Sequence, residues 1–275
     1  MRKLGIIAGG GTLPGTVMRV CLKQKRPFFV VALKGFCDES LLPKGIDVIW
    51  SRMGAVGTME RALKKAGAQD LMLIGSVRRP SVRELCPDLS ALRFLLKIGF
   101  KARGDNGLLS AVVHEIESRG LRVVGVHDVV PSLIVQKGVY GAFKPDKKNE
   151  ADIAHGIHVA KILGAADVGQ SVVIQQGLVL AVEAIEGTDA LLKRVGSLTR
   201  RGHAGVLVKV MKPHQERRAD LPTIGPNTVQ GVFDAGLKGI AVEAGSSLLA
   251  EPEKTIALAD RLGIFIVGVE TVCQK

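Results

Sequence analysis

The sequence has few aromatic residues and no long hydrophobic run. Phe, Trp and Tyr make up 4% of the 275 residues, so the stacking platforms of proteins that bind single-stranded nucleic acid are scarce. No segment approaches about 18 uncharged apolar residues, the length that a transmembrane helix requires. The apolar run near Met1 spans about five residues and ends in glycines, which is too short for a signal peptide. We therefore expect a soluble, cytoplasmic chain whose first apolar run is a buried strand.

Cysteine and histidine motifs are also missing. The cysteines at positions 21, 37, 86 and 273 form no CxxC pair, which is typical of a reducing cytosol, where most cysteines are small buried residues. His155 and His158 stand at i, i+3 without a third metal ligand. The sequence contains neither a GxSxG motif nor a Cys-His catalytic signature.

Positive charge is concentrated in the first half of the chain. The net charge is +12; residues 1–130 hold 21 Lys and Arg against 11 Asp and Glu, whereas residues 131–275 hold 17 against 15. A basic half can bind nucleic acid, an anionic membrane surface or a phosphorylated substrate. Because aromatic residues are scarce and no helix-turn-helix or zinc-finger spacing appears, we expect no nucleic acid partner.

Apolar runs alternate with amphipathic stretches in the first half. This alternation predicts a mostly parallel sheet, in which ligands bind at the carboxyl ends of the strands. The predicted strands are residues 4–8, 28–33, 47–50, 71–74 and 121–126, and the predicted helices are 13–23, 57–66 and 108–119.

The pattern breaks between residues 126 and 150, where Pro, Gly and a polar run lack helical period. We expect an N-terminal domain over residues 1–130, a linker over 131–149 and a C-terminal α/β domain over 150–275, with a ligand cleft between the domains. The predicted elements of the second domain are helices 150–163, 189–195, 226–235 and 251–262, and strands 171–185, 205–211, 239–244 and 264–269.

A glycine-rich loop follows the first predicted strand. Gly9, Gly10 and Gly11 precede Thr12 and a helix whose N-terminus offers free N–H groups to phosphate. The spacing departs from GxGxxG, and the second strand ends in Ala-Leu-Lys without the acidic residue that a dinucleotide ribose needs. The loop predicts phosphate or nucleotide binding, with a plain strand–helix turn as the alternative, and argues against a nicotinamide cofactor.

Two more turns of the first half carry charged groups. Residues 75–80 read GSVRRP after a predicted strand, which suits a diphosphate clamp because arginine can grip phosphate through two parallel hydrogen bonds. A solvated basic turn fits equally well. Residues 103–107 read RGDNG and present Asp105 before a predicted helix, where a helix N-cap is the alternative role.

Residues 87–103 predict an apolar helix with a cationic stripe. Leu92, Leu95 and Leu96 recur at helical spacing, and Arg93, Lys97 and Lys101 form a narrow cationic stripe. A helix this apolar is most often part of a core, and we favour that interpretation. A wall for acyl chains and a surface helix on an anionic leaflet are the alternatives.

Polar segments of the second half begin in or follow predicted strands and contain Thr188, Asp189, Lys209 and Asp220. Asp189 and Asp220 are hard oxygen ligands of the kind that Mg²⁺ uses beside substrate phosphates. Thr188 can instead cap the next helix. Asp220 stands before Leu-Pro, and a cap for the following helix would lie nearer Pro226.

Together these segments resemble the metal-dependent UDP-2,3-diacylglucosamine pyrophosphatases of the LpxI type, which belong to lipid A synthesis in Gram-negative bacteria. The resemblance rests on KLGIIAGGGTLPG, GSVRRP, GLVLAVEAIEGTDALLKRV, and KPHQERRADLPTIGP followed by GIAVEAG, in order from residue 3 to about 270. It implies a Rossmann-like N-terminal domain, a distinct C-terminal domain, and a lipid enclosed between them. It also implies cleavage to UMP and 2,3-diacylglucosamine 1-phosphate (lipid X), by water attack on the sugar-side phosphoryl with Mg²⁺, or Mn²⁺ in its place.

The resemblance also implies site residues. Asp220, in an Asp-Leu-Pro-Thr motif, is expected to be catalytic and, with Asp189, to bind the metal. The basic first half would be attracted to anionic lipid at the cytoplasmic face of the inner membrane, and a homodimer formed by domain exchange stays open. The expected substrate-binding residues are Gly10, Gly11, Thr12, Leu13, Gly75, Ser76, Arg78, Asp105, Gln170, Thr188, Asp189, Lys209, Thr223 and Glu243.

Two other classes stay open. A Rossmann-like oxidoreductase or nucleotide-sugar transferase predicts protection from heat by NAD(P) or by another nucleotide sugar. A nucleotide- or lipid-binding regulator without hydrolase activity predicts tight binding and no metal-dependent turnover. Acidic residues that face an anionic ligand disfavour the regulator, because burying them there is costly unless a metal or a proton offsets their charge.

Overall fold

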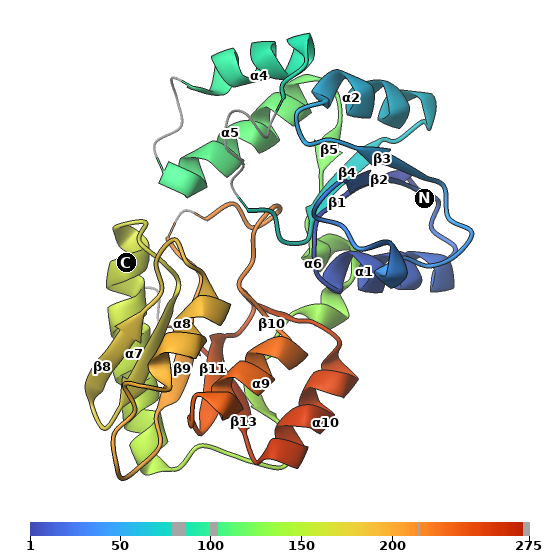
Figure 1. Ribbon diagram of the computed structural model, residues 1–275. Helices are drawn as coiled ribbons and strands as arrows, with labels where there is room; N and C mark the ends of the chain where they lie inside the picture. Colours follow the sequence, from blue (N-terminus) through green and yellow to red (C-terminus); the bar gives the residue numbers. More distant parts are fainter. Residues whose placement is uncertain (79–85, 100–103, 214, 272–275) are drawn as a thin grey trace. The chain divides into compact units, whose positions relative to one another are not determined.

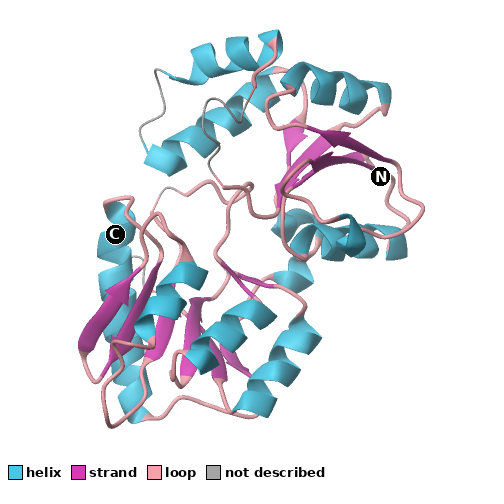
Figure 2. Cartoon of the chain, viewed as in Figure 1, coloured by secondary structure: helices cyan, strands magenta, loops and turns pink. Residues whose placement is uncertain are grey.

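The computed structural model describes residues 1–78, 86–99, 104–213 and 215–271, and the chain divides into two compact units. Unit 1 comprises Met1–Pro131 and Glu216–Asp220, and unit 2 comprises Ser132–Gln215 and Leu221–Lys275. Each unit combines helices with a β-sheet (Figures 1 and 2), so the predicted two-domain α/β class is confirmed. The interdomain cleft expected from the sequence stays a prediction.

Unit 1 contains a parallel five-stranded sheet with the order β3-β2-β1-β4-β5. Sequential strands run outward in one direction from β1 to β3, and in the other from β4 to β5. The loops after β1 and β4 therefore flank the point where the strand order reverses, which is the usual ligand position of an open α/β sheet. The strands are β1 (Leu4–Ala8), β2 (Phe28–Leu33), β3 (Val48–Ser51), β4 (Asp70–Ile74) and β5 (Arg122–Val123). The strand predicted at 121–126 is shorter, because the chain turns into a helix at Val126.

Helices cover both faces of this sheet (Figure 1). On one face, Met59 and Leu63 of α2 pack with Val31 and Leu71 of the sheet. Among its described residues, unit 1 has the helices α1 (Leu13–Lys23), α2 (Val56–Lys65), α4 (Leu89–Gly99), α5 (Gly104–Ser118) and α6 (Val126–Val129) and the 3-10 helix η1 (Glu39–Leu41). A second 3-10 helix, η2 (Pro131–Leu133), begins at the last residue of unit 1 in this part of the chain and continues into unit 2.

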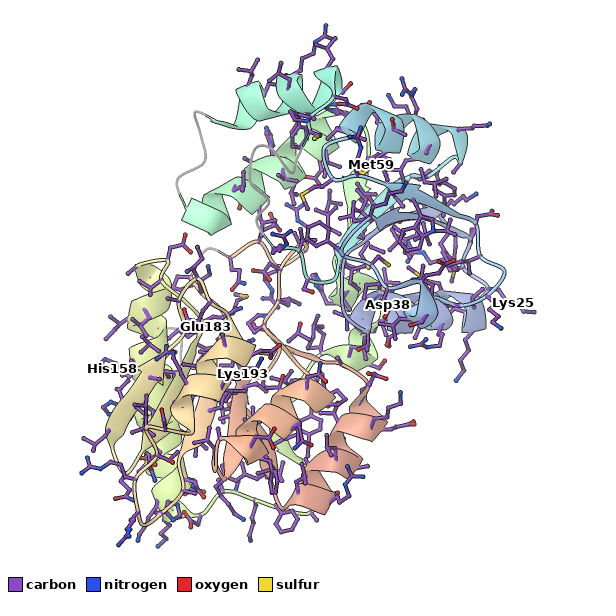
Figure 3. All side chains as sticks on the ribbon, in the orientation of Figure 1. Lys25, Asp38, Met59, His158, Glu183 and Lys193 are labelled. Atoms are coloured by element: carbon purple, nitrogen blue, oxygen red, sulfur yellow. The ribbon has the colours of Figure 1, made fainter. Side chains whose placement is uncertain are left out.

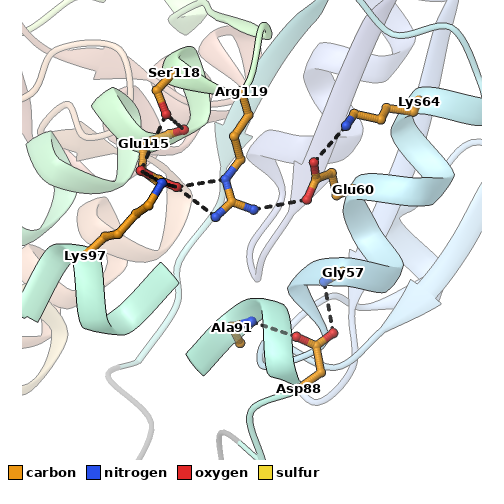
Figure 4. Close-up of polar contacts among 9 residues, drawn as sticks. All are labelled: Gly57, Glu60, Lys64, Asp88, Ala91, Lys97, Glu115, Ser118 and Arg119. Atoms are coloured by element: carbon orange, nitrogen blue, oxygen red, sulfur yellow. Dashed lines mark hydrogen bonds and ion pairs between the residues drawn. The ribbon is translucent and has the colours of Figure 1, made fainter. Parts of the chain in front are cut away.

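Polar contacts hold α4 beside α2 and α5 (Figure 4). The Asp88 carboxylate accepts hydrogen bonds from Ala91 N at 2.7 Å and from Gly57 N at 2.9 Å, so one side chain caps the N-termini of two helices. Lys97 Nζ lies 3.1 Å from Glu115 Oε1 on α5. Ala91 is 2% exposed and marks the side of α4 that faces its neighbours.

The opposite side of α4 carries exposed leucines. Leu89, Leu92 and Leu96 are 67%, 48% and 63% exposed, and their i, i+3, i+7 spacing places them in one stripe along the helix. The core interpretation is therefore wrong for Leu92 and Leu96. Helical period identifies an apolar face, but it does not reveal that α2 already covers the sheet beneath.

Unit 2 contains a mixed six-stranded sheet with the order β6-β13-β11-β9-β7-β8. The single strand predicted at 171–185 is instead a hairpin, because Gln176 and Gly177 adopt φ values of 54° and 76° and turn the chain. The strands are β6 (Gly138–Tyr140), β7 (Ser171–Gln175), β8 (Leu178–Val182), β9 (Val206–Lys209), β11 (Gly239–Glu243) and β13 (Phe265–Val269), and a separate pair joins β10 (Thr223–Ile224) to β12 (Leu248–Leu249). The stretch 131–149, predicted as a linker, contains η2, β6 and the first residues of α7.

The sheet of unit 2 is buried on both faces. In β9, Leu207 belongs to the core on one face, whereas Val206 and Val208 belong to the core on the other, as the period of two in a strand requires. The helices are α7 (Lys147–Ala165) beside the second of these cores, and α8 (Thr188–Val195), α9 (Pro226–Asp234) and α10 (Pro252–Leu262) beside the first. Within the described ranges, no helix is long and apolar enough to cross a membrane.

Candidate functional site

The glycine-rich loop and the GSVRRP loop are joined in unit 1. Gly10 N donates to Ser76 O at 2.8 Å, and Ser76 N donates to Gly10 O at 2.9 Å, so these residues form an antiparallel bridge beyond the ends of β1 and β4. Gly9 N also donates to Ile74 O at 2.8 Å. The structure thus brings together two segments that the sequence analysis selected separately, at the point where the strand order reverses.

Two glycines of this pair of loops adopt φ values that favour glycine, for different reasons. At Gly75 (φ +97°), a Cβ atom would lie 2.7 Å from Gly10 O and 2.8 Å from Gly9 C, so the close approach of the two loops requires glycine. At Gly11 (φ +85°), a Cβ atom would meet nothing within 4 Å. Gly11 is exposed and leaves open space above the loop, where a ligand can approach the backbone.

The N-terminus of α1 adjoins this open space. Thr12 is the N-cap residue but makes no side-chain capping hydrogen bond, and the first turn contains no acidic residue. Pro14 has no N–H group, so Leu13 and Gly15 supply the first-turn donors. Their N–H groups and the helix dipole favour an anion at this end of α1.

A basic residue directly follows each of the strands β2 and β3 of the same sheet. Lys34 comes directly after β2 and Arg52 directly after β3, at the same carboxyl edge as Gly9. Both side chains are exposed, and neither makes an ion pair with a residue that the structure describes. The sequence analysis did not select Lys34 and Arg52. Their position could have identified them, because residues that directly follow a buried strand of an α/β sheet lie where ligands bind.

The remaining candidates of unit 1 are less fully described. Arg78 is exposed at the end of the described stretch 1–78. The other arginine of the GSVRRP motif lies outside the described residues. Asp105 lies in the first turn of α5, and its side chain also lies outside them.

In unit 2, a polar cluster gathers at one edge of the sheet around the Thr188 hydroxyl. Lys209 Nζ donates to Thr188 Oγ1 at 2.8 Å, and Thr188 Oγ1 donates to Glu183 Oε1 at 2.9 Å. Ser171 Oγ lies 3.4 Å from the same hydroxyl. Because β7 runs antiparallel to β8 and β9, its first residue Ser171 meets the residues that end or follow the other two strands. The structure therefore does not support helix capping as the role of Thr188, since Gly187 is the N-cap residue of α8.

The charges of this cluster are buried and incompletely compensated. Lys209 and Glu183 are each 6% exposed, and Glu183 is labelled in Figure 3. Among the described residues, Lys209 has no acidic group within 4.0 Å, and Glu183 Oε2 has no hydrogen-bond partner. Burying an ammonium group is costly unless an anion accompanies it. Glu183 is linked to Lys209 only through the Thr188 hydroxyl, and direct contact of Lys209 with an anionic ligand stays a prediction.

Gln170 and Glu243 lie near the same edge but are engaged by protein groups. Glu243 accepts hydrogen bonds from Lys161 Nζ at 2.8 Å, from Met211 N at 2.7 Å and from Thr271 Oγ1. Gln170 O accepts from Val210 N at 3.0 Å, and its side chain lies 3.4 Å from Gln215 Nε2. These contacts hold the loops that follow β9 and β11, and a direct role of either side chain in binding substrate stays a prediction.

Asp220 is the last residue of the short segment Glu216–Asp220, which belongs to unit 1. Its N–H group donates to Glu216 O at 2.9 Å, and Leu221, the next residue, is back in unit 2. Thr223 then begins β10, where its hydroxyl donates to Leu221 O at 3.0 Å. Asp189, the other predicted metal ligand, is exposed in the first turn of α8.

The oxygen donors present suit a magnesium ion that arrives with a diphosphate. Across the described part of the chain, no group of three or more His, Cys, Asp or Glu side chains is placed to hold a metal ion. Mg²⁺ does not require such a cage, because it is commonly held by one or two carboxylates together with substrate phosphates and water. The carboxylates of Asp220 in unit 1 and Asp189 in unit 2 are each an oxygen donor of this kind, and metal binding by either stays a prediction.

Fold and site together define a two-domain α/β protein with a candidate anion-binding site on each unit. The model of the LpxI N-terminal domain matches residues 3–133, and the model of the LpxI C-terminal domain matches residues 136–267. The UDP-2,3-diacylglucosamine pyrophosphatase LpxI of Caulobacter vibrioides is 43% identical over 278 residues, covering 98% of each chain. This chain therefore belongs to the LpxI family. A solved structure of the CobK precorrin-6A reductase covers 100% of this chain and 91% of its own at 12% identity, but its TM-score of 0.32 supports no argument.

Proposed function

We propose that this protein hydrolyses the diphosphate of UDP-2,3-diacylglucosamine, releasing UMP and 2,3-diacylglucosamine 1-phosphate for lipid A synthesis. The observation that carries this proposal is the 43% identity to the Caulobacter UDP-2,3-diacylglucosamine pyrophosphatase over 98% of both chains. A match of that extent spans the loops of both units, and therefore the residues proposed here to bind the diphosphate.

The two edges supply groups that a nucleotide diphosphate needs. Unit 1 offers the open space at Gly11 and the N-terminus of α1. Unit 2 offers the buried ammonium of Lys209, which lacks a close acidic partner among the described residues. Thr188 holds that ammonium in place, so the cation is oriented before the ligand arrives.

In the proposed reaction, water attacks the phosphoryl group attached to the sugar, the bond to the bridging oxygen breaks, and UMP leaves. The Asp220 carboxylate accepts a hydrogen bond from the attacking water and orients it. Asp220 and Asp189 would hold Mg²⁺, or Mn²⁺ in its place, and the ion would offset negative charge on the phosphoryl oxygens. Lys209 and the N–H groups at the start of α1 stabilise the charge that develops on the diphosphate.

The substrate is a glycolipid, and two features support contact with the cytoplasmic face of the inner membrane. Leu89, Leu92 and Leu96 form an exposed apolar stripe on α4, and residues 1–130 hold an excess of basic over acidic residues of 21 to 11. Anionic lipid attracts such a surface, and exposed leucines can enter the region of the acyl chains. A homodimer remains a separate proposal.

The test is hydrolysis of UDP-2,3-diacylglucosamine by the purified protein in water enriched in ¹⁸O, with Mg²⁺ and with a chelator. We expect UMP release that requires the metal, with the label in the sugar phosphate. Asp220→Asn should abolish turnover, whereas Asp234→Asn, at an exposed aspartate at the end of α9, should not change it. Absence of turnover by folded wild-type protein with every divalent metal would overturn the proposal and favour a binding protein.

A further inference from the structure

The segment Glu216–Asp220 leaves the unit to which its neighbours in sequence belong. The residues before it, up to Gln215, and after it, from Leu221, count with unit 2, whereas these five residues count with unit 1. The segment is built as one turn, in which Ala219 N and Asp220 N both donate to Glu216 O, at 3.0 and 2.9 Å. The position of the Asp220 backbone therefore depends on what holds this turn.

Arg218 holds the turn from within. Its Nε donates to Glu216 Oε1 at 2.8 Å, and its Nη2 donates to Glu216 Oε2 at 2.9 Å. This two-point geometry fixes the orientation of the planar guanidinium group.

The third nitrogen of the same guanidinium group, Nη1, contacts a residue of α5. Arg218 Nη1 donates to Glu117 Oε1 at 2.8 Å, and the same oxygen lies 3.4 Å from the N–H group of Val123 in β5. The turn also approaches Gly125, where a Cβ atom would lie 3.2 Å from the Cα atom of Arg218. Glu117, Arg218 and Glu216, here called the Arg218 anchor, therefore attach the turn to the core elements of unit 1.

Stability alone does not account for the anchor. The Arg218 and Glu117 side chains are 35% and 34% exposed, and an ion pair of that exposure contributes little to the free energy of unfolding. The main effect of this ion pair is instead to fix the position of the turn, and this matters because the turn ends at Asp220. A displacement of about 1 Å at a reacting group can lower a rate by a hundredfold.

We infer that Arg218 and Glu117 are positioning residues, which hold the Glu216–Asp220 turn on unit 1 so that Asp220 stands in its working position. The inference rests on the proposed function, in which Asp220 orients the attacking water. Neither residue contacts the substrate in this account. Each acts through the turn.

The test is a double-mutant cycle on kcat and KM with Arg218→Lys, Glu117→Gln and the two together. Lysine keeps the charge but loses the planar fork. Arg122→Lys is the matched control, because Arg122 forms a similar fork to Asp70 at 2.9 and 3.1 Å at the amino end of β4 in the same unit. We expect each test variant to lose roughly tenfold or more in kcat, with KM changed less than about threefold.

The double variant should lose no more activity than the worse single variant, because both changes break the same anchor. Arg122→Lys should keep kcat within about twofold of wild type. Additive losses, near-wild-type kcat in either single variant, or an equal loss in Arg122→Lys would each overturn the inference.

Hydrogen exchange separates this inference from the proposed function. If the wild-type protein has no hydrolase activity, the proposed function fails, but the anchor can still be measured. The amides of Ala219 and Asp220 should then exchange faster in Arg218→Lys than in the wild type or in Arg122→Lys. Unchanged exchange of these two amides would overturn the anchor itself.

Discussion

Replacing Gly75 by alanine tests whether the joined loops of unit 1 require the close approach seen at their bridge. The φ value of Gly75 is +97°, and a Cβ atom there would lie 2.7 Å from Gly10 O and 2.8 Å from Gly9 C. Gly67 provides a matched control, because its φ value is +71° and a Cβ atom would meet nothing within 4 Å. The two substitutions therefore share the backbone penalty and differ in the steric one.

The magnitudes follow from these two terms. A left-handed backbone conformation destabilises an alanine by about 1–2 kcal/mol, and both variants carry this penalty. Crowding against immovable backbone adds about 1–3 kcal/mol at Gly75 alone. Both variants recover about 0.4–1 kcal/mol, because alanine restricts the unfolded chain. We therefore expect Gly75→Ala to lower the free energy of unfolding by about 1–3 kcal/mol more than Gly67→Ala does.

Urea unfolding followed by tryptophan fluorescence can measure this difference. Trp50 in β3 is the single tryptophan of the sequence, so the signal reports on unit 1. Hydrolase activity measured in parallel should fall in Gly75→Ala, because the bridge between Gly10 and Ser76 would open. Losses of unfolding free energy that agree within about 0.5 kcal/mol in the two variants would refute the steric reasoning.

Further predictions concern the ligand edges and the acid stability of unit 1. Gly11→Ala should destabilise the fold by only about 1–2 kcal/mol, yet weaken UMP binding measured by calorimetry; unchanged affinity would exclude this loop from the site. Lys209→Met should lower kcat/KM by roughly tenfold or more, whereas Lys193→Met, at an exposed position of α8, should not; equal effects would contradict the role of the buried ammonium. The hydrogen bond from Lys64 lowers the pKa of Glu60 below its usual 4.5, so its stabilisation is present above that pH and is lost as pH falls through the lowered pKa. Glu60→Gln should therefore flatten the decline of unfolding free energy below pH 4.5, and an unchanged decline would refute the assignment.

Most elements of the fold were predictable from the sequence because burial imposes a period. The runs at 4–8, 28–33 and 239–244 fall in strands, within one residue of the observed ends. The hairpin of β7 and β8 was missed, because a glutamine such as Gln176 does not indicate the positive φ value that turns the chain there. Strand β6 was missed as well, because Gly138–Tyr140 is a short edge strand and three residues are too few to show alternation.

The candidate site was predictable only in part. A loop after a buried strand is a site candidate by position, and this rule selected Gly10, Ser76 and Lys209. Glu183 begins one of the selected segments but was not among the expected site residues, because its importance comes from the hydroxyl of Thr188 and the nearby ammonium. Those partners come from different elements, and no spacing along the chain encodes their contact.

The sequence by itself determined the alternation of strands and helices, the glycine-rich loop before α1 and the excess of positive charge in residues 1–130, because each is a local property or a sum. The tertiary structure decided that Gly10 pairs with Ser76, that the leucines of α4 are exposed and that Glu216–Asp220 counts with unit 1. The physical reason is that local patterns specify which face of an element is apolar and where a chain turns. Which elements become neighbours depends on packing of the whole unit, and the site is made of contacts between such neighbours.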